Sequence, residues 1–310
     1  MRKIFFLSLF VVALFSTQNN ITDLHFIVPG GKGGGWDSTA RTVGGVLLDA
    51  GIIQNITYEN ISGNGGAHAI HSFLFESREQ PNILLVNSTP IVIRSLQGFY
   101  TTSYKDLTPI ASVIVDYGVL VVRKDEFSNW QELLFFAKNN HSALKLGGGS
   151  IHGGMDHLVV SKIFRLGGVN PKTLEYKAFD AGGVAMEELV KGEVDVLSTG
   201  FGEAIQAHLR GEIKIIGVTS KKSIQNIPSF RSLGIDLFFA NWRGFFANAN
   251  LKQKKASQLA KLLAQIYKTP SWKKVSQENG WSDFYLAPDA FKDFLFEQEN
   301  EIKNLMKEMG

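Results

Sequence analysis

The sequence predicts an α/β protein with two domains that close around a ligand cleft. Short β-rich runs alternate with helical patterns in two successive series, as in sheets of mainly parallel strands. Two extended stretches, at 109–123 and 235–247, join the series and indicate a hinge. Almost every predicted strand precedes a loop rich in Gly, Ser and Thr, where open α/β sheets bind ligands. The alternative at this level is one continuous α/β domain with a helical tail.

The first series shows the alternation of strands and helices most clearly. Between 38 and 50, apolar residues recur at the three- and four-residue spacing of an amphipathic helix, and Gly51 follows as a C-cap glycine. A second helix is predicted at 66–77. The predicted strands are 24–28, 55–59 and 82–86.

The second series follows two extended runs, 109–115 and 117–123, which are interrupted at Asp116 and Tyr117. Ser128-x-x-Gln131 has the pattern of a capping box and predicts the start of a helix. The remaining strands are predicted at 143–147, 173–177, 194–198 and 213–218, and the helices at 155–166, 183–191, 202–209, 252–267, 270–279 and 289–306. The last three helices are expected to fold back onto the first domain. We therefore assign lobe 1 to 21–115 plus 242–310 and lobe 2 to 116–241, with hinge crossings near 113–118 and 236–243.

The N-terminal 20 residues have the layout of a secretory signal peptide. Arg2 and Lys3 precede an apolar run, Ile4–Phe15, that is too short to span a bilayer. We expect cleavage between Ser16 and Asn20; the alternative is an anchor that stays attached. The chain has no cysteine, which excludes disulfides, thiolate metal sites and a lipid-modified N-terminal cysteine. These features predict a protein free in the periplasm, not lipid-anchored, and monomeric.

The charge balance argues against a nucleic-acid partner. Removal of Arg2 and Lys3 lowers the formal net charge from +3 to +1, whereas nucleic-acid binding favours a basic surface. The glycine-rich loops suit a small anion instead, because they expose backbone N–H groups at the positive ends of helices. The loops are 29–39, 60–68, 87–90, 147–157, 178–183 and 198–203.

Known catalytic and cofactor motifs are not matched. Lys32 is followed by Gly33, not by Ser or Thr as in a Walker loop, and no G-x-G-x-x-G fingerprint is complete. Ser150 lacks one glycine of the nucleophile elbow, and the histidines near 68 and 152 lack an established zinc spacing. We therefore expect no catalytic residue, no metal and no cofactor. A carboxylate is the nearest alternative to a phosphate, because amides, hydroxyls and waters bind it well.

Several stretches resemble the substrate-binding receptors of tripartite tricarboxylate transporters, the TctC or Bug family. They include VPGGKGGGWDSTAR, YENISGNGGAHAI, YKDLTPIASV, LGGGSIHGGMDH, YKAFDAGG, VKGEVDVLSTGFGE, LRGEIKIIGV and IDLFFANWRGFFA, in family order from about Phe26 to Ala247. The resemblance implies a periplasmic-binding-protein-like fold of Venus flytrap type. It implies that the protein captures a small tricarboxylate or dicarboxylate and delivers it to a large and a small membrane subunit. Lys32 stands where many members have proline or alanine, and either adds a counter-charge or is a solvated loop residue.

The resemblance also implies the ligand-binding residues, mainly through main-chain groups and hydroxyls of both lobes. They are Gly34, Gly35, Trp36, Asp37, Ser38, Thr39, Gly65, Ser88, Gly149, Ser150, His152, Gly153, Gly154, Asp156, Phe179, Asp180, Gly182, Thr199, Glu203 and Trp242. Asp37 either only caps the helix that it precedes or also contacts ligand, and Trp36 is either a cleft wall or packs on its own helix. Glu203 either compensates a helix dipole or faces ligand.

Two other functions remain open from the sequence. An accessory of a membrane sensor kinase would have the same fold and ligand. An enzyme on the same scaffold would need catalytic motifs that the sequence lacks. The sequence does not identify the carboxylate, because main-chain contacts leave little trace in the side chains.

Overall fold

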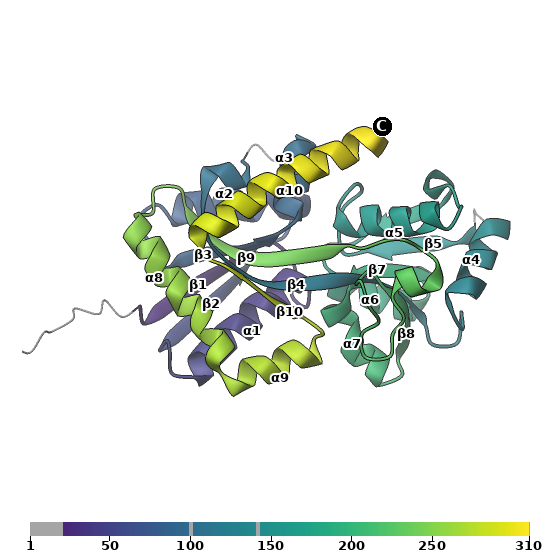
Figure 1. The fold of residues 1–310 in the computed structure, drawn as a ribbon, viewed down its shortest axis with the longest axis horizontal. Helices are drawn as coiled ribbons and strands as arrows, with labels where there is room; N and C mark the ends of the chain where they lie inside the picture. Colours follow the sequence, from purple (N-terminus) through teal and green to yellow (C-terminus); the bar gives the residue numbers. More distant parts are fainter. Residues whose placement is uncertain (1–20, 99–101, 141–142, 310) are drawn as a thin grey trace, which may run out of the picture.

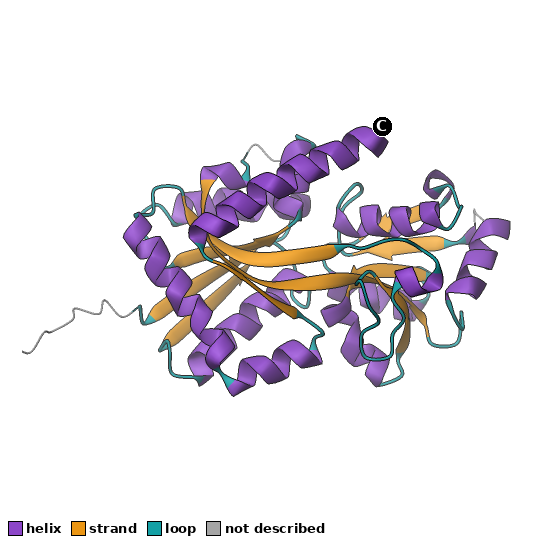
Figure 2. Ribbon diagram, viewed as in Figure 1, coloured by secondary structure: helices purple, strands orange, loops and turns teal. Residues whose placement is uncertain are grey.

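The protein consists of two α/β lobes joined by two long strands (Figure 1, Figure 2). The structure is a computed structural model that describes residues 21–98, 102–140 and 143–309, with side chains up to residue 303. The predicted signal peptide, 1–20, lies outside the described residues. None of the helices in this described part combines the length and apolar character needed to cross a membrane.

The first lobe contains a parallel sheet extended by antiparallel strands. β1 (Asp23–Val28) lies between β2 (Asn55–Asn60) and β3 (Ile83–Ser88), parallel to both. β9 (Ala240–Asn248) continues the sheet antiparallel to β3, and β4 (Leu107–Arg123) pairs antiparallel with β9 and with β10 (Ser282–Leu286). The helices between these strands are α1 (Gly35–Asp49), α2 (Ala67–Glu76) and α3 (Pro90–Leu96).

The second lobe repeats this plan on the other half of β4. β5 (Lys145–Gly148) is parallel to β6 (Glu175–Ala178) and β7 (Val196–Gly200), while β4 runs antiparallel to β7 and β8 (Ile213–Val218). The helices of this lobe are α4 (Trp130–Asn139), α5 (Met155–Leu166), α6 (Gly182–Lys191) and α7 (Phe201–Leu209). Short 3-10 turns lie at Asn64–Gly66, Tyr104–Asp106, Pro171–Thr173, Phe230–Leu233 and Ala264–Lys268.

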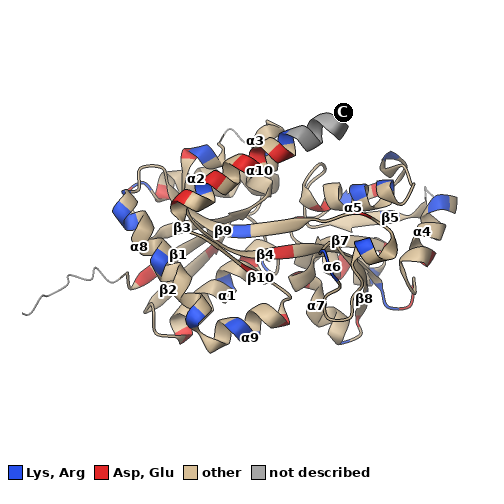
Figure 3. Ribbon diagram, in the orientation of Figure 1, with Lys and Arg blue, Asp and Glu red and all other residues tan. Residues whose placement is uncertain are grey.

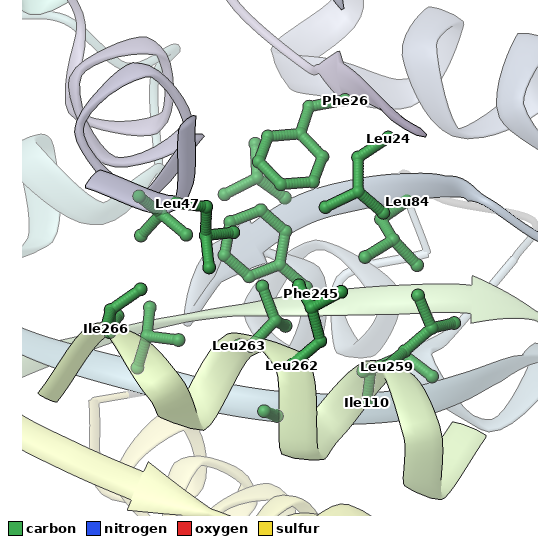
Figure 4. Close-up of a cluster of buried hydrophobic side chains, with 14 of the residues drawn as sticks. Leu24, Phe26, Leu47, Leu84, Ile110, Phe245, Leu259, Leu262, Leu263 and Ile266 are labelled. Carbon is green, nitrogen blue, oxygen red and sulfur yellow. The ribbon is translucent and has the colours of Figure 1, made fainter. Parts of the chain in front are cut away.

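The C-terminal helices pack on the first lobe, although they follow the second in sequence. α8 (Gln253–Leu263) buries Leu259 and Leu263 against Phe26 and Phe245 of the sheet (Figure 4). α9 (Pro270–Glu278) adds Trp272 to the same core, and α10 (Pro288–Met309) packs on the other face of the sheet through Phe291 and Leu295. The first lobe therefore closes only after the chain has returned through β9.

Three local predictions differ from the structure. The two runs around Asp116 form one continuous strand, β4, because Asp116 and Tyr117 pair with Asn241 and Ala240 of β9; the Asp116 carboxylate is paired with Arg243. Helix α1 begins at Gly35, with Gly34 as N-cap, so Asp37 lies inside the first turn and is not the N-cap. The cap of α4 is Asn129, whose side chain accepts from Glu132 N, and Ser128 lies outside the helix.

Charged residues lie mostly on the helices and loops, whereas the strands of both sheets are largely uncharged (Figure 3). Two exceptions are Asp116 on β4 and Arg243 on β9, which are 1% and 2% exposed. A buried charge costs free energy unless it is paired and hydrogen-bonded. This pair lies where the two long strands pass between the lobes, at the floor of the site described below.

Candidate functional site

A cavity of about 80 Å³ lies between the lobes, at the carboxyl ends of strands from both sheets. A second cavity of about 90 Å³ adjoins it and shares six lining residues with it. Together they form what we call the interlobe cleft. The first cavity is lined by Gly30, Gly31, Gly34, Gly35, Trp36, Ser88, Pro90, Gly149, Ser150, Met155, Asp156, Asp180, Ala181, Gly182, Gly200, Glu203, Asn241 and Arg243.

Two loops, one from each lobe, have nearly the same backbone geometry at this cleft. Gly33 and Gly153 have φ of 77° and 68°, a conformation that favours glycine. In the first loop Gly34 N donates to Gly31 O, and in the second Gly154 N donates to Ile151 O. A helix starts directly after each of these turns. The N–H of Gly33 donates to Asp37 Oδ2 at 3.0 Å, and that of Gly153 donates to His157 Nδ1 at 2.8 Å. Asp37 and His157 therefore hold equivalent turns.

Four helices, α1, α5, α6 and α7, begin at the cleft. The N-cap residues of α1, α5 and α6 are Gly34, Gly154 and Ala181, and none makes a side-chain cap hydrogen bond. Because first-turn N–H groups have no partner within the helix, such ends bind anions well. The cleft thus offers helix N-termini from both lobes to a single small anion.

A buried charged cluster forms the floor of the cleft. Arg243 Nη2 lies 2.8 Å from Asp116 Oδ2 and 3.9 Å from Glu203 Oε1, and its Nη1 donates to Thr39 Oγ1 at 3.1 Å. Among the described residues, Arg243 Nε has no hydrogen-bond partner. Burial raises the pKa of Asp116 and the pKa of Glu203, and the Arg243 charge opposes both shifts.

Asp156 adds a third buried carboxyl from the first turn of α5. Burial, reinforced by the charge of Glu203, raises the pKa of Asp156 to about 8. The Ser150 hydroxyl accepts from Asp156 N at 2.9 Å, and Tyr176 Oη donates to Ser150 O at 2.8 Å. A carboxyl with so high a pKa can hold a proton near neutral pH, and a protonated carboxyl can donate a hydrogen bond.

Trp36 forms one wall of the cleft. It lines both cavities, and its Nε1 donates to Ser88 Oγ at 2.8 Å, which fixes the ring across the cleft. Asp37 is 4% exposed and does not line either cavity. Its carboxylate accepts from Gly33 N, Arg41 Nε and Asn60 Nδ2, so it supports the loop. Lys32 is exposed and lines neither cavity.

The two lobes are in direct contact around the cleft. Arg94 of α3 donates to the carbonyls of Ile151 and His152 in the other lobe at 3.4 and 3.2 Å, and Gln97 donates to Gly153 O at 3.1 Å. On the opposite side, Gln225 Nε2 donates to Gln277 O at 2.8 Å. These contacts hold the lobes in a closed arrangement.

Most of the predicted ligand-binding residues come together here. Gly34, Gly35, Trp36, Ser88, Gly149, Ser150, Asp156, Asp180, Gly182 and Glu203 line the first cavity, and Gly65, Gly154 and Phe179 line the second. Asp37, Ser38, Thr39, His152, Gly153 and Thr199 belong to the same loops and helices without lining either cavity. Trp242 lies elsewhere: it packs on Phe246, Phe291 and Phe294, and its Nε1 donates to Gln298 Oε1.

Three residues that line the cleft lie outside the glycine-rich loops predicted from the sequence: Arg94, Asn241 and Arg243. Asn241 and Arg243 flank Trp242 on β9 and line the first cavity, whereas Trp242 does not, because successive side chains on a strand point to opposite faces. Arg94 lines the second cavity although the short helix that carries it has no recognisable motif. The remaining lining residues all lie within the six glycine-rich loops predicted from the sequence, although they were not singled out there: Pro29, Gly30, Gly31, Asn64, Gly66, Pro90, Ile151, Met155, Ala181 and Gly200.

One possible metal-binding group lies away from the cleft. Among the described residues, His25, Glu59 and Glu76 place their ligand atoms within 4.8 Å of one another. The Nε2 atom of His25 is 3.7 Å from the Glu59 carboxylate, which forms an ion pair only when the imidazole is protonated. None of the three residues lines the interlobe cleft.

Comparison with known proteins identifies both the family and the fold. The family model described as "Tripartite tricarboxylate transporter family receptor" matches residues 51–310. No curated protein sequence matches the chain. Similar solved structures include the periplasmic binding protein BugD, with 21% identity, TM-score 0.83 and coverage of 93% of this chain and 97% of that one.

Two further similar structures come from Rhodopseudomonas palustris. MatC with bound malate has 18% identity, a TM-score of 0.79 and coverage of 91% of this chain and 97% of that one. A second R. palustris protein, with adipate, has 17% identity, a TM-score of 0.82 and coverage of 93% and 97%. These similarities establish the two-lobed periplasmic-binding-protein fold.

Proposed function

The chain belongs to the tripartite tricarboxylate transporter receptor family, and from this premise we propose that it is a periplasmic receptor for a small organic carboxylate. The interlobe cleft is the binding site, and the dicarboxylate or tricarboxylate bridges the two lobes. Similar structures hold malate and adipate, which supports a dicarboxylate as the class of ligand.

The observation that carries this proposal is the meeting of helix N-termini from both lobes at one cavity. α1 belongs to the first lobe, whereas α5 and α6 belong to the second, and their N-caps leave the first-turn N–H groups to other partners. A carboxylate placed between them accepts hydrogen bonds from both lobes at once. Such a ligand stabilises the closed arrangement relative to an open one, because only the closed form offers both sets of donors.

The predicted ligand-binding residues divide into two roles in this proposal. Gly34, Gly35, Gly149 and Gly182 present main-chain groups, while Ser88 and Ser150 contribute hydroxyls. Asp37, Thr39 and Thr199 support these residues from behind. No observation favours the enzymatic alternative, so we propose that the protein binds its ligand without turnover.

The finer steps follow the family. We infer that an N-terminal signal peptide exports the chain, and that the closed receptor delivers its ligand to one large and one small membrane subunit. Closure changes the relative position of the two lobes, so a membrane partner that contacts both can distinguish the loaded form.

The proposal is tested by identifying the ligand that the protein binds. Native mass spectrometry of protein purified without refolding should show a bound organic acid that is lost on denaturation. Thermal unfolding with malate, adipate and citrate should raise the midpoint by several degrees for at least one of them, because a ligand that binds only the folded state stabilises it. If none of these organic acids raises the unfolding midpoint of ligand-free protein, the proposal is wrong.

A further inference from the structure

The Glu203 carboxylate lies in the cleft where the N-termini of α1 and α6 meet. It lies in the first turn of α7, its side chain is 11% exposed, and it lines the first cavity. One carboxylate oxygen accepts from Thr199 Oγ1 and from Gly200 N. A Cβ atom added to Gly35 would lie 2.6 Å from Glu203 Oε1, and one added to Gly182 would collide with Oε2. The carboxylate therefore touches the first residues of α1 and α6, which come from opposite lobes.

Few cationic side chains face Glu203. The charged groups facing it are Arg243 from β9, Asp116 from β4 and Asp156 from α5, and Asp180 lines the same cavity. Arg243 is already committed to Asp116 at 2.8 Å. An incoming carboxylate thus meets more carboxyl groups than guanidinium groups. Two carboxylates in contact cannot both ionise at low cost, and one of them retains a proton.

We propose that Glu203 links ligand capture to proton uptake: the cleft binds a carboxylate anion together with one proton, which Glu203 donates in a hydrogen bond to the ligand. This inference rests on the proposed function. The proton comes from solvent, adds to a Glu203 oxygen, and lies between that oxygen and a carboxylate oxygen of the ligand; no other bond changes. Thr199 donates a hydrogen bond to Glu203 Oε2, which leaves Oε1 to carry the proton.

The proposal makes Glu203 a specificity-determining residue. Ligand affinity falls as the pH rises through the pKa of the shared proton, by up to tenfold per pH unit. Asp156 is a second carboxyl near the ligand, and burial with the charge of Glu203 raises its pKa to about 8.

The experiment is calorimetric titration of the full chain with malate, adipate and citrate at pH 5.5, 7.0 and 8.5. Each titration is run in two buffers of different ionisation enthalpy, which gives the number of protons taken up. We expect close to one proton per ligand at pH 7.0–8.5 and a loss of affinity toward high pH. Binding of a carboxylate with no proton uptake would overturn this inference alone. No binding of any probe at any pH would overturn the proposed function as well.

Variants assign the proton to Glu203. Glu203→Gln, which keeps a hydrogen-bond donor but does not titrate, should abolish the uptake and flatten the pH dependence, whereas the exposed Glu187→Gln on α6 should leave both unchanged. Asp156→Asn should preserve most of the uptake. Uptake lost in Asp156→Asn and retained in Glu203→Gln would overturn the assignment. If Glu203→Gln does not fold, Thr199→Val is the second test. Without the Thr199 hydroxyl, which donates to the Glu203 carboxylate, the pKa of Glu203 should rise, and the pH midpoint of ligand affinity should rise with it. An unchanged midpoint would refute the role of Glu203.

Discussion

Replacing Arg243 with methionine tests whether the two crossing strands depend on one buried ion pair. The side chains of Arg243 and Asp116 are 3% and 1% exposed and their atoms lie 2.8 Å apart. Removal of one partner from such a pair leaves a buried, uncompensated charge and costs about 3–5 kcal/mol. For a domain of 150–250 residues this corresponds to a fall in Tm of roughly 6–20 °C.

The pH dependence of that loss identifies its cause. Burial already raises the pKa of Asp116 above 3.8, and Arg243 opposes the shift. Without Arg243 the folded-state pKa rises further. A carboxyl whose folded pKa exceeds its unfolded pKa contributes stability that is present below the unfolded value and lost as the pH rises through the folded value. The deficit of Arg243→Met relative to the native protein should therefore shrink between pH 7 and pH 5.

The assay is urea unfolding of native protein, Arg243→Met, Asp116→Asn with Arg243→Met, and Arg231→Met at each pH. The double variant should recover part of the loss, because it removes the uncompensated charge. Arg231 is the matched control: its pair with Asp236 is 47% and 86% exposed, so its loss should cost no more than about 1 kcal/mol. Arg243→Met no less stable than Arg231→Met, or a deficit independent of pH, would refute this reasoning.

Three further variants test the two loops. Gly34→Val places a Cβ 3.2 Å from the Ala181 Cβ of the other lobe, so it should weaken carboxylate affinity at least tenfold while Tm stays within a few degrees. Gly45→Ala is the control, because the space around Gly45 is open. Equal carboxylate affinities of the two variants would argue against closure of the lobes. Burial, with the charges of His152 and Arg94, lowers the pKa of His157 below 6.5. The stability that His157 contributes should therefore be complete above pH 6.5 and be lost as the pH falls toward the folded-state pKa. In urea unfolding, His157→Asn should reduce this loss, and an unaltered pH profile would contradict the role of His157. Asp37→Ala should cost about 2 kcal/mol of unfolding free energy, because a charged hydrogen-bond acceptor of the loop is lost; unchanged stability with abolished binding would instead place Asp37 in direct contact with ligand.

The regular elements were predictable from local patterns. Helix α5 has the predicted bounds, 155–166, and the first three strands lie within two residues of their predictions, because hydrophobic periodicity is a local property. The start of α1 was missed, because Gly34 caps the helix without a side chain to mark it. Strand β10 and helix α3 were also missed; both are short.

The site was predictable only where its residues are close in sequence. The loops at 30–39 and 147–157 are recognisable from their glycines alone. The Asp116–Arg243 pair joins residues 127 positions apart, and a single aspartate in a β-rich run looks like a break until its partner is known. Trp242 was selected in place of Arg243 because no local pattern shows which face of β9 meets the cleft.

The most direct test of the account compares a dicarboxylic acid with its neutral isostere. Calorimetric titration with adipate and with adipamide, at the same pH and temperature, isolates the contribution of the carboxylate charge, since the two molecules differ little in size. The helix N-termini that meet in the cleft favour negative charge. Adipate should bind about a hundredfold more tightly than adipamide, because each of these helix N-termini favours a negative charge by about 1 kcal/mol. Equal affinities of adipate and adipamide would contradict a carboxylate receptor.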